Sequence, residues 1–413
     1  MKSASIVAVG NELLNGQRVD TNSNWLQGRL LRLGFQTCRV VLVPDDKEAI
    51  AAVLGEVSRI SDVVILTGGL GPTADDLTRF ALAEFLGRPL EFRADIWQTI
   101  EAFFERRGLK TASTNRVQAY LPCGAKALAN PKGTACGIAA EHEGKRYFCL
   151  PGVPAEMMSM FDDSVCPELV ADGQTDVIEM GKVRCFGVGE SVIAEKLGDL
   201  MRRDRNPQIN TTVQGGDVLL HIVAAAPDPD STRHLIEADK RQLSELLGDA
   251  VYGYDDQTLP EVVGRLLKAK RWKLAVAESC TGGLLAKMIT DIPGSSEYFW
   301  GGWVTYSNEA KIQDLGVPED FIQRYGAVSE PVAAAMASGA AQRSGVDAAL
   351  SISGIAGPEG GTPEKPVGMV CIGLFMQGRT EVQTFRFAPV GREAVRQRAS
   401  LTALNWLRLK LRV

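Results

Sequence analysis

The sequence predicts an α/β protein built from three successive parts. We expect an N-terminal open, mostly parallel sheet with helices on both faces at 1–165, a small α+β linking domain at 166–255, and a C-terminal α/β domain at 256–413. The 413 residues suffice for two or three domains of about 150 residues each. Strand-type and helix-type runs alternate in the first and third parts, whereas alternating strands mark the middle one.

The first part opens with buried strands that alternate with amphipathic helices. The runs SIVAVG (4–9) and VVILTG (63–68) are rich in β-branched residues and are typical of buried strands. Apolar residues recur at helical spacing over 22–33, and a second helix follows Pro44-Asp45-Asp46. A further helix is expected from Asp76 to Gly87, because helices often end at glycine. This alternation predicts parallel strands with helices on both faces.

The later elements follow the same reasoning. In the middle part, VLLHIVAAA (218–226) alternates as a strand between helices expected at 190–202 and 231–246. In the third part, a helix through Leu267 precedes the strand KLAVA, and Ser329 is a plausible N-cap for a helix with Pro331 in its first turn. The remaining expected elements are strands at 348–354, 368–376 and 381–388 and a helix from Gly391.

Composition excludes several classes of protein. The formal net charge of −5 provides no basic field, so we expect no nucleic-acid partner. The apolar runs are far shorter than the ~20 residues of a membrane span, and we expect no membrane partner. Eight cysteines form no CxxC pair, which favours a reducing cytoplasm. The three histidines lie outside any recognisable motif, which argues against a Ser-His-Asp triad or a histidine metal site.

A first candidate site is the glycine-rich segment LTGGLGPTADDLT at 66–78. It follows a buried strand and precedes a helix, at the carboxyl end of a strand where open sheets bind ligands. Gly68, Gly69 and Gly71 would let backbone N–H groups approach a phosphate, to which Thr73 would donate a further hydrogen bond. The segment is neither a P-loop nor a dinucleotide fingerprint.

Acidic residues accompany this turn. Asp75 and Asp76 offer hard oxygen ligands that, with a diphosphate, suit a divalent metal ion. Glu12 ends the first strand and would face the same crevice. The alternative is that these glycines and aspartates form a tight turn and cap a helix.

Two more turns remain open to both interpretations. In NPKGTACG, the residues Asn130, Gly133 and Thr134 either complete a nucleotide or pterin pocket or only shape a loop. The motif GVGES at 187–191 is interpreted as a structural turn between a strand and a helix.

A second candidate site combines serine and lysine without histidine. AVAESCTGG places Ser279 at the end of an apolar strand, before a helix whose expected N-cap is Thr281. Such a hydroxyl needs a base, and WVTYSNEAK offers Tyr306 and Lys311. A partly buried lysine can have a pKa low enough to accept a proton. The alternative is an ordinary capping serine and a solvated lysine, and Cys280 is a rival nucleophile without a histidine.

Other groups could join this site. The turn SISGIAGPEGG supplies the hydroxyl of Ser353 and backbone donors around Gly357 for an oxyanion or phosphate. The closing helix adds basic side chains that can hold an acidic substrate. These are Arg392, Arg396 and Arg398.

The motifs together resemble the CinA family of competence/damage-inducible protein A homologues. The resemblance covers essentially the whole chain and rests on GNELLNGQ, TGGLGPTADDLT, GTACG, PGVPAEM, GVGES, ESCTGGLLAKMI and SGIAGPEGG, in this order. It implies a molybdopterin-binding-type N-terminal domain and a C-terminal amidohydrolase domain. The chain departs from the family pattern at Asn11, at Cys136, where proline is usual, and at Ser353, where threonine is usual.

The resemblance also implies two activities in pyridine-nucleotide recycling. The C-terminal domain would hydrolyse the carboxamide of nicotinamide mononucleotide to nicotinate mononucleotide and ammonia without a cofactor. Ser279 would be the nucleophile and Lys311 its base, with Tyr306 and Ser353 in the same pocket. The N–H groups from Thr281 through Gly282 to Gly283 would hold the oxyanion. The N-terminal domain would be an ADP-ribose pyrophosphatase that uses a divalent metal ion.

Alternatives of other classes remain. The N-terminal domain would then only bind a pterin or a nucleotide, or the chain would be a regulatory or scaffold protein linked to competence. We also expect a homodimer, the common state of large α/β proteins of this sort.

Overall fold

The computed structural model describes residues 2–170 and 177–412. The chain folds into two compact units, one of residues 1–179 with 225–233 and the other of residues 180–224 with 234–413. The boundaries expected from sequence at 165 and 255 stay a prediction, because this division does not separate the middle part from the C-terminal part.

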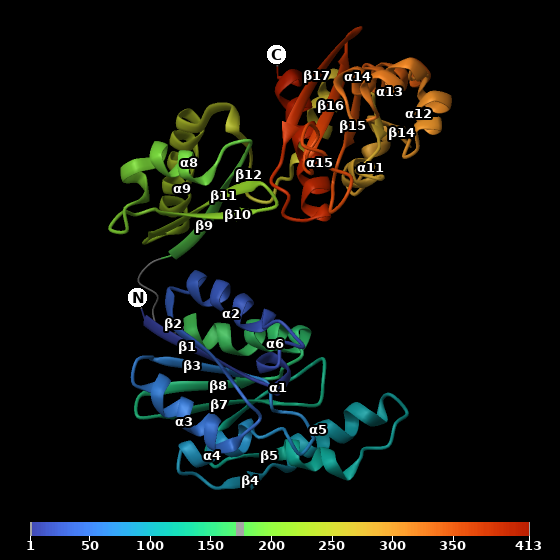
Figure 1. Ribbon diagram of the computed structural model, residues 1–413. Helices are drawn as coiled ribbons and strands as arrows, with labels where there is room; N and C mark the ends of the chain where they lie inside the picture. Colours follow the sequence, from blue (N-terminus) through green and yellow to red (C-terminus); the bar gives the residue numbers. More distant parts are fainter. Residues whose placement is uncertain (1, 171–176, 413) are drawn as a thin grey trace. The chain divides into compact units, whose positions relative to one another are not determined.

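The first unit is built on a six-stranded sheet of order β2-β1-β3-β8-β7-β6 (Figure 1). The first four strands in this order run parallel, and β7 and β6 are antiparallel additions. The strands are β1 (Lys2–Val9), β2 (Phe35–Val43), β3 (Val63–Thr67), β6 (Lys126–Leu128), β7 (Gly137–His142) and β8 (Lys145–Leu150), with a separate hairpin of β4 (Leu90–Phe92) and β5 (Tyr120–Pro122).

Helices cover both faces of this sheet, as the alternating pattern predicts. Leu26 of α2 and Met157 of α6 pack in the core on one face, whereas Leu54 of α3 and Leu82 of α4 pack in the core on the other. The helical segments are α1 (Asn11–Leu14), α2 (Thr21–Arg32), α3 (Lys47–Ser58), α4 (Thr78–Phe85), α5 (Ala94–Glu105), η1 (Ser113–Ala119), α6 (Pro154–Met160), η2 (Phe161–Val165) and α7 (Cys166–Val170). The helix expected from Asp76 begins only at Thr78, because Asp76 belongs to the preceding turn.

The middle part forms a four-stranded sheet of order β10-β11-β9-β12. Its inward side chains, such as Leu220 and Ile222 of β11, pack against Ile193 of α8 and Leu243 of α9. The elements are β9 (Val177–Phe186), α8 (Glu190–Leu197), η3 (Gly198–Met201), β10 (Gln208–Gln214), β11 (Asp217–Ala226), α9 (Pro229–Leu247), η4 (Gly248–Ala250) and β12 (Val251–Tyr254).

The C-terminal part is a five-stranded sheet of order β14-β13-β15-β16-β17. The first three strands are parallel and the last two antiparallel. Side chains of β13 alternate between two cores, since Val276 faces the core of α10 and α15 and Ala277 faces that of α14. The elements are α10 (Leu259–Lys270), β13 (Leu274–Glu278), α11 (Leu284–Thr290), η5 (Ser295–Glu297), β14 (Phe299–Val304), α12 (Asn308–Leu315), α13 (Glu319–Tyr325), α14 (Glu330–Ser344), β15 (Ala348–Gly354), β16 (Met369–Met376), β17 (Arg379–Arg386) and α15 (Arg392–Leu411).

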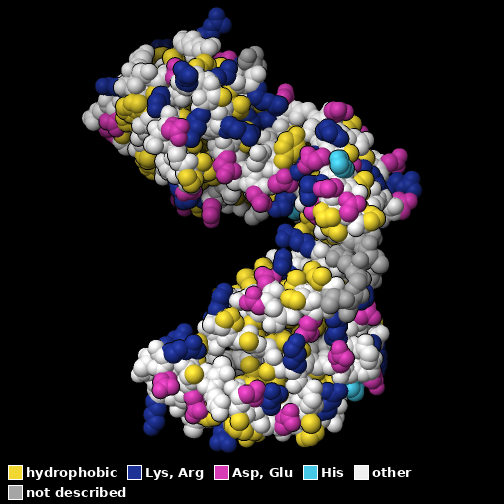
Figure 2. Space-filling model, turned by 180° about the vertical axis from the view of Figure 1, so that it is seen from behind, with side chains coloured by type: hydrophobic (Ala, Val, Ile, Leu, Met, Phe, Trp, Pro, Cys, Tyr) yellow, Lys and Arg dark blue, Asp and Glu magenta, His cyan; other side chains and the backbone are white. Residues whose placement is uncertain are grey.

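The predicted α/β class is therefore confirmed. No helix within the described residues combines the length and apolar character that crossing a membrane would require. On the face seen in Figure 2, basic and acidic side chains are interspersed rather than gathered by sign. Each of the eight cysteines lies in the described ranges as a free thiol.

Candidate functional site

Ser279 and Lys311 meet at the carboxyl end of the C-terminal sheet. Ser279 directly follows β13, and its N–H donates to the carbonyl of Ile352 on the neighbouring strand at 2.9 Å. Lys311 lies in the first half of α12, which starts shortly after β14. The Lys311 Nζ atom is 3.2 Å from the Ser279 Oγ atom. The sequence suggests this pair only because a reactive serine hydroxyl needs a base. In the fold, the two side chains are within hydrogen-bonding distance.

The environment of Lys311 is unusual for a lysine. Its side chain is only 1% exposed, which excludes the role of a solvated surface residue. The Nζ atom donates to the carbonyl of Thr305 at 2.9 Å and lies 3.4 Å from the carbonyl of Tyr306. Burial lowers the pKa of Lys311, and the nearby carboxylate of Glu309 partly opposes this shift. A lysine with a lowered pKa is neutral more often and is better able to accept a proton.

Glu278 holds the turn that carries Ser279, a role that sequence reasoning missed. Its carboxylate is fully buried and accepts hydrogen bonds from the N–H groups of Gly283 (3.0 Å), Leu285 (3.1 Å) and Ala286 (2.8 Å). These N–H groups lie at the start of α11, where a helix leaves its donors unpaired and favours negative charge. The Thr281 N-cap prediction is therefore wrong, because Gly283 is the N-cap residue and the Glu278 carboxylate accepts from the N–H groups at the start of α11. The only available signal was an acid at the end of an otherwise apolar strand.

The expected oxyanion donors also need correction. The N–H of Gly282 donates to the carbonyl of Ser279 at 3.1 Å, and the N–H of Gly283 is held by Glu278. Both donors are thus engaged within the protein. Among the described residues, nothing accepts a hydrogen bond from the N–H groups of Cys280 and Thr281, so these two are the donors left beside Ser279. The hydroxyl of Thr281 is buried and also lacks a partner there.

We expect Glu278→Gln to destabilise the protein. The amide keeps one acceptor oxygen but loses the charge that three N–H groups share, so the free energy of unfolding should fall by about 1.5–3 kcal/mol. Urea unfolding measures this change. The matched control is Glu364→Gln, on an exposed loop, which should unfold like the parent. Equal stability of the two variants would show that the cap contributes little.

Arg392 connects two other segments beside this site. Its guanidinium donates to the Tyr306 hydroxyl at 2.9 Å and to the Gly357 carbonyl at 2.9 Å. Arg396, one turn further along α15, donates to the Thr281 carbonyl at 3.2 Å through Nε. The structure thus brings Tyr306, Gly357 and Arg392 together, whereas the Tyr306 hydroxyl, expected beside Lys311, bonds to Arg392 and its side chain is 61% exposed. The third arginine, Arg398, lies on another face of α15.

Two other candidates are less suited to the expected chemistry. Ser353 is buried and donates its hydroxyl to the carbonyl of Ala327 at 2.7 Å, so its proton is already engaged within the protein. Because Ile352 is the register partner of Glu278, Ser353 and Ser279 follow neighbouring strands at the same end of the sheet, and the role of Ser353 in the pocket stays a prediction. Burial raises the pKa of the Cys280 thiol to about 11, so little thiolate exists near neutral pH. This disfavours Cys280 as the nucleophile.

The glycine-rich turn of the first unit is closed by its own aspartate. One oxygen of Asp76 accepts from the Gly71 N–H at 2.7 Å and the other from the Thr73 N–H at 2.8 Å, and the Thr73 hydroxyl also donates to it. The Gly68 N–H donates to the carbonyl of Leu150 at 3.0 Å. The donors of Gly68, Gly71 and Thr73 expected for a phosphate are thus already engaged, and Gly69 alone of this set keeps a free N–H within the described residues.

The glycines of this turn have a packing reason. A Cβ atom at Gly68 would lie 2.3 Å from the carbonyl oxygen of Val9, and one at Gly69 would lie 2.3 Å from the Thr78 hydroxyl. Both also have positive φ angles, +106° and +67°. A tight turn followed by a helix, the alternative interpretation of this segment, accounts for these residues.

The metal site expected at Asp75 and Asp76 stays a prediction. Across 2–170 and 177–412, no three His, Cys, Asp or Glu side chains are grouped so as to hold a metal ion. Asp45 accepts from the Asn11 N–H at 2.9 Å, and burial raises its pKa, with a contribution from the nearby charges of Glu12, Asp75 and Asp76. These acids lie near one another, but Asp76 has both oxygens occupied by the turn. We derive no step through a metal ion.

We expect Asp76→Ala to destabilise the first unit much more than Asp75→Ala does. The former leaves three donors of the turn without their acceptor and should cost about 1–3 kcal/mol, whereas Asp75 is exposed. Thermal unfolding with and without Mg²⁺ measures both changes. A rise in melting temperature with Mg²⁺ that Asp75→Ala abolishes would support the metal-site prediction.

Asn130, Gly133 and Thr134 line a separate cavity of about 480 Å³ beside α5. Asn130 accepts from the N–H groups of Lys132 and Gly133 and donates to the Ala135 carbonyl and the Glu156 carboxylate. All of its hydrogen-bonding groups are used to shape the loop. A Cβ at Gly133 would lie 2.3 Å from an oxygen of Glu156. These observations favour the loop-shaping interpretation.

Cys136 lies in the same cavity wall, and its Sγ is 3.5 Å from the Gln118 carbonyl.

Comparison with known proteins agrees with the motif order. Residues 5–171 match the model of a probable molybdopterin binding domain, 182–253 that of the damage-inducible protein CinA KH domain, and 256–411 that of the CinA C-terminal domain. A putative competence-damage inducible protein of Symbiobacterium thermophilum is 44% identical over 98% of both chains. The chain belongs to the CinA family. A CinA-like protein of Dictyoglomus thermophilum is 41% identical, again over 98% of both chains.

Solved CinA structures match parts of the chain. The protein CinA with unknown function from Thermoplasma acidophilum is 33% identical and covers 41% of this chain and 98% of its own, with a TM-score of 0.38. The competence/damage inducible protein CihA from Agrobacterium tumefaciens is 38% identical and covers 38% of this chain and 98% of its own, with a TM-score of 0.36. The names of these CinA relatives state no reaction.

Proposed function

We propose that the C-terminal part is a serine–lysine amidohydrolase that cleaves the carboxamide of nicotinamide mononucleotide. The observation that carries this proposal is the 3.2 Å approach of a buried lysine amine to the Ser279 hydroxyl. The lowered pKa of Lys311 supports its role as a base without histidine. The free N–H groups of Cys280 and Thr281 supply donors for an oxyanion. The substrate itself comes from the family resemblance.

The reaction would proceed through an acyl-enzyme. Neutral Lys311 takes the hydroxyl proton of Ser279, and the oxygen attacks the carboxamide carbon. The tetrahedral oxyanion is held by backbone N–H groups, a contribution typically worth about 3 kcal/mol for one donor. Lys311 then protonates the leaving nitrogen, the C–N bond breaks, and ammonia departs. Lys311 then takes a proton from a water molecule, the resulting hydroxide attacks the ester, and Lys311 returns the proton to the Ser279 oxygen as the ester C–O bond breaks and nicotinate mononucleotide departs.

The charges around the site favour an anionic substrate. The guanidinium groups of Arg392 and Arg396 act electrostatically on the Cys280 thiol, next to the nucleophile. An arginine can bind a phosphate through two parallel hydrogen bonds. The phosphate of a nucleotide is therefore better suited to this site than an uncharged amide.

The deciding experiment is ammonia release by the full chain. We expect release from nicotinamide mononucleotide and much slower release from nicotinamide riboside, which lacks the phosphate, and from glutamine. Ammonia release that is equal for all three compounds would contradict the nucleotide substrate. Absence of release from each of them would contradict the amidohydrolase itself.

ADP-ribose pyrophosphatase activity of the N-terminal unit stays a prediction from the resemblance. Because the donors of the glycine turn are occupied, the turn gives this activity no support. The alternative, a domain that binds a nucleotide without turnover, is equally compatible with such a turn. A cytoplasmic location is supported by the eight free thiols. The homodimer remains an expectation.

A further inference from the structure

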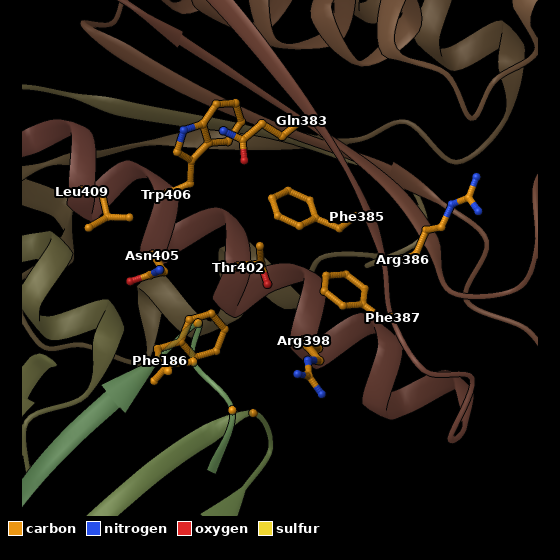
Figure 3. A pocket seen from close by; sticks show the side chains of 14 residues that line it. Phe186, Gln383, Phe385, Arg386, Phe387, Arg398, Thr402, Asn405, Trp406 and Leu409 are labelled. Carbon is orange, nitrogen blue, oxygen red and sulfur yellow. The ribbon is translucent and has the colours of Figure 1, made fainter. Parts of the chain in front are cut away.

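A cavity in the same unit as Ser279 carries groups that the amidohydrolase does not use. It has a volume of about 480 Å³ and lies between the turn Phe186–Gly189 of the middle part, β17 with the segment that follows it, and α15 (Figure 3). The turn contains the first three residues of GVGES, the motif interpreted from sequence as purely structural. The volume falls within the range of about 300–1,000 Å³ typical of small-molecule sites.

This cavity is separated from Ser279 by α15. Arg392 and Arg396, four residues apart, lie on the helix face that contacts the turn that carries Ser279 and Gly357. The α15 residues that line the cavity are instead spaced by four, three and four positions, so they form another face of the same helix. These residues are Arg398, Thr402, Asn405 and Leu409.

The cavity has aromatic walls. The rings of Phe385 and Phe387 lie nearly parallel, with 3° between their planes and 5.9 Å between their centres. Phe186 and Trp406 contribute from the middle part and from α15. Figure 3 shows Phe385 and Phe387 side by side above α15, with Phe186 on the opposite side of the helix residues Thr402 and Asn405. Ring faces of this kind stack on planar heterocycles.

The charge of the cavity favours an anion. Among the described residues, two arginines and no Asp or Glu line it. The guanidinium of Arg398 lies 6.0 Å from the centre of the Phe387 ring and makes no hydrogen bond or ion pair with any other residue of the described ranges. Figure 3 shows Arg386 pointing away, which leaves Arg398 as the principal cation. The first N–H groups of α8, which begins after Gly189, have no side-chain cap and add partial positive charge at the opposite wall.

Polar side chains complete the site. Gln383 and Thr402 border the cavity, and Asn405 uses its oxygen to accept from Arg408 Nε at 2.9 Å, which leaves its NH₂ group for a ligand. Arg408 also donates to the Val251 carbonyl at 2.9 Å and is 1% exposed, so this wall is firmly attached to the middle part. The carboxamide groups of asparagine and glutamine can form hydrogen bonds with the donors and acceptors at the edge of a nucleotide base.

We propose that this cavity binds a mononucleotide, with its base among the aromatic rings and its phosphate on Arg398. A ring face, an unpaired cation and edge-recognising amides within a volume of this size fit one nucleotide better than an apolar ligand or a polymer. The site is independent of the reaction proposed for Ser279.

The test is calorimetric titration of the full chain with AMP, with adenosine and ribose 5-phosphate as half-ligands. We expect AMP to bind more tightly than either half. Arg398→Glu should weaken AMP binding about tenfold or more, and Phe387→Leu, which keeps apolar volume but removes the ring, about fivefold or more. Lys410→Gln, on the same helix but paired with Glu381, is the matched control and should bind as the parent does.

The results that would contradict the mononucleotide site can be told apart. AMP affinity that is unchanged in both Arg398→Glu and Phe387→Leu would overturn the proposal, as would the absence of binding at millimolar AMP. A single-stranded RNA of ten nucleotides that binds while AMP does not would assign the surface to nucleic acid instead. Circular dichroism of each variant verifies folding, and retained ammonia release by Arg398→Glu separates this cavity from the amidohydrolase site.

Discussion

Replacement of Ser279 by alanine should abolish ammonia release from nicotinamide mononucleotide, with a loss on the order of 10⁴–10⁶-fold in kcat. The loss is large because the Oγ atom forms the covalent intermediate, and among the described residues Lys311 has no other hydroxyl within hydrogen-bonding distance. Single-turnover mass spectrometry should reveal an acyl adduct on the parent and none on Ser279→Ala.

The matched control for this variant is Cys280→Ser, at the adjacent position. Because burial holds the pKa of this thiol at about 11, its removal should leave kcat within a few-fold of the parent. An active Ser279→Ala variant together with an inactive Cys280→Ser variant would exchange the roles of the two residues and reject the proposed mechanism.

Replacement of Lys311 by methionine should reduce kcat by roughly 10³-fold while the fold is kept. General bases commonly contribute 10²–10⁴-fold, and methionine fills a similar volume without a proton acceptor. Lys311→Arg should be equally inactive, since a guanidinium remains protonated. Rescue of a smaller variant, Lys311→Ala, by added methylamine would identify the lost group as an amine. Undiminished activity of Lys311→Met would eliminate lysine as the base.

The lowered pKa of Lys311 also predicts two pH dependences. Activity of the parent should rise with pH through a pKa below the ordinary lysine value of 10.5, because only the neutral amine accepts a proton. Between that pKa and 10.5 the unfolded chain binds more protons than the folded one, so the free energy of unfolding should also rise with pH. Lys311→Met should lack this rise in stability. A parent profile that is flat through this range would contradict the lowered pKa.

Much of the architecture could be predicted from local pattern. The hydrophobic run before Ser279 and the helical spacing after it place this hydroxyl at the end of a strand, as the structure confirms for β13 and α11. Such patterns are visible within a few residues, because a helix or strand that buries one face repeats its apolar side chains at a fixed spacing. The capping of α11 was predicted wrongly, since Thr281 and Glu278 are both capable acceptors and the path of the turn selects between them.

The N-terminal turn shows a second limit. Its glycines and aspartates are compatible with a phosphate site and with a self-closed loop, and composition does not distinguish the two. In the fold, the side chain of Asp76 turns back to the N–H groups of Gly71 and Thr73. A donor that is satisfied within the protein is no longer offered to a ligand, and this depends on the side-chain direction rather than on the residue type.

The sequence by itself indicated the alternation of strands and helices, the family and two candidate reactive groups, because each follows from periodicity or from motifs of residues close in the chain. Only the tertiary structure decided that Ser279 and Lys311, 32 positions apart, come within 3.2 Å. The parallel register of β13 with β14 aligns Glu278 with Val304 and so brings the segments after both strands to the same edge. The surrounding chain then excludes water from the lysine, and that burial is what lowers its pKa.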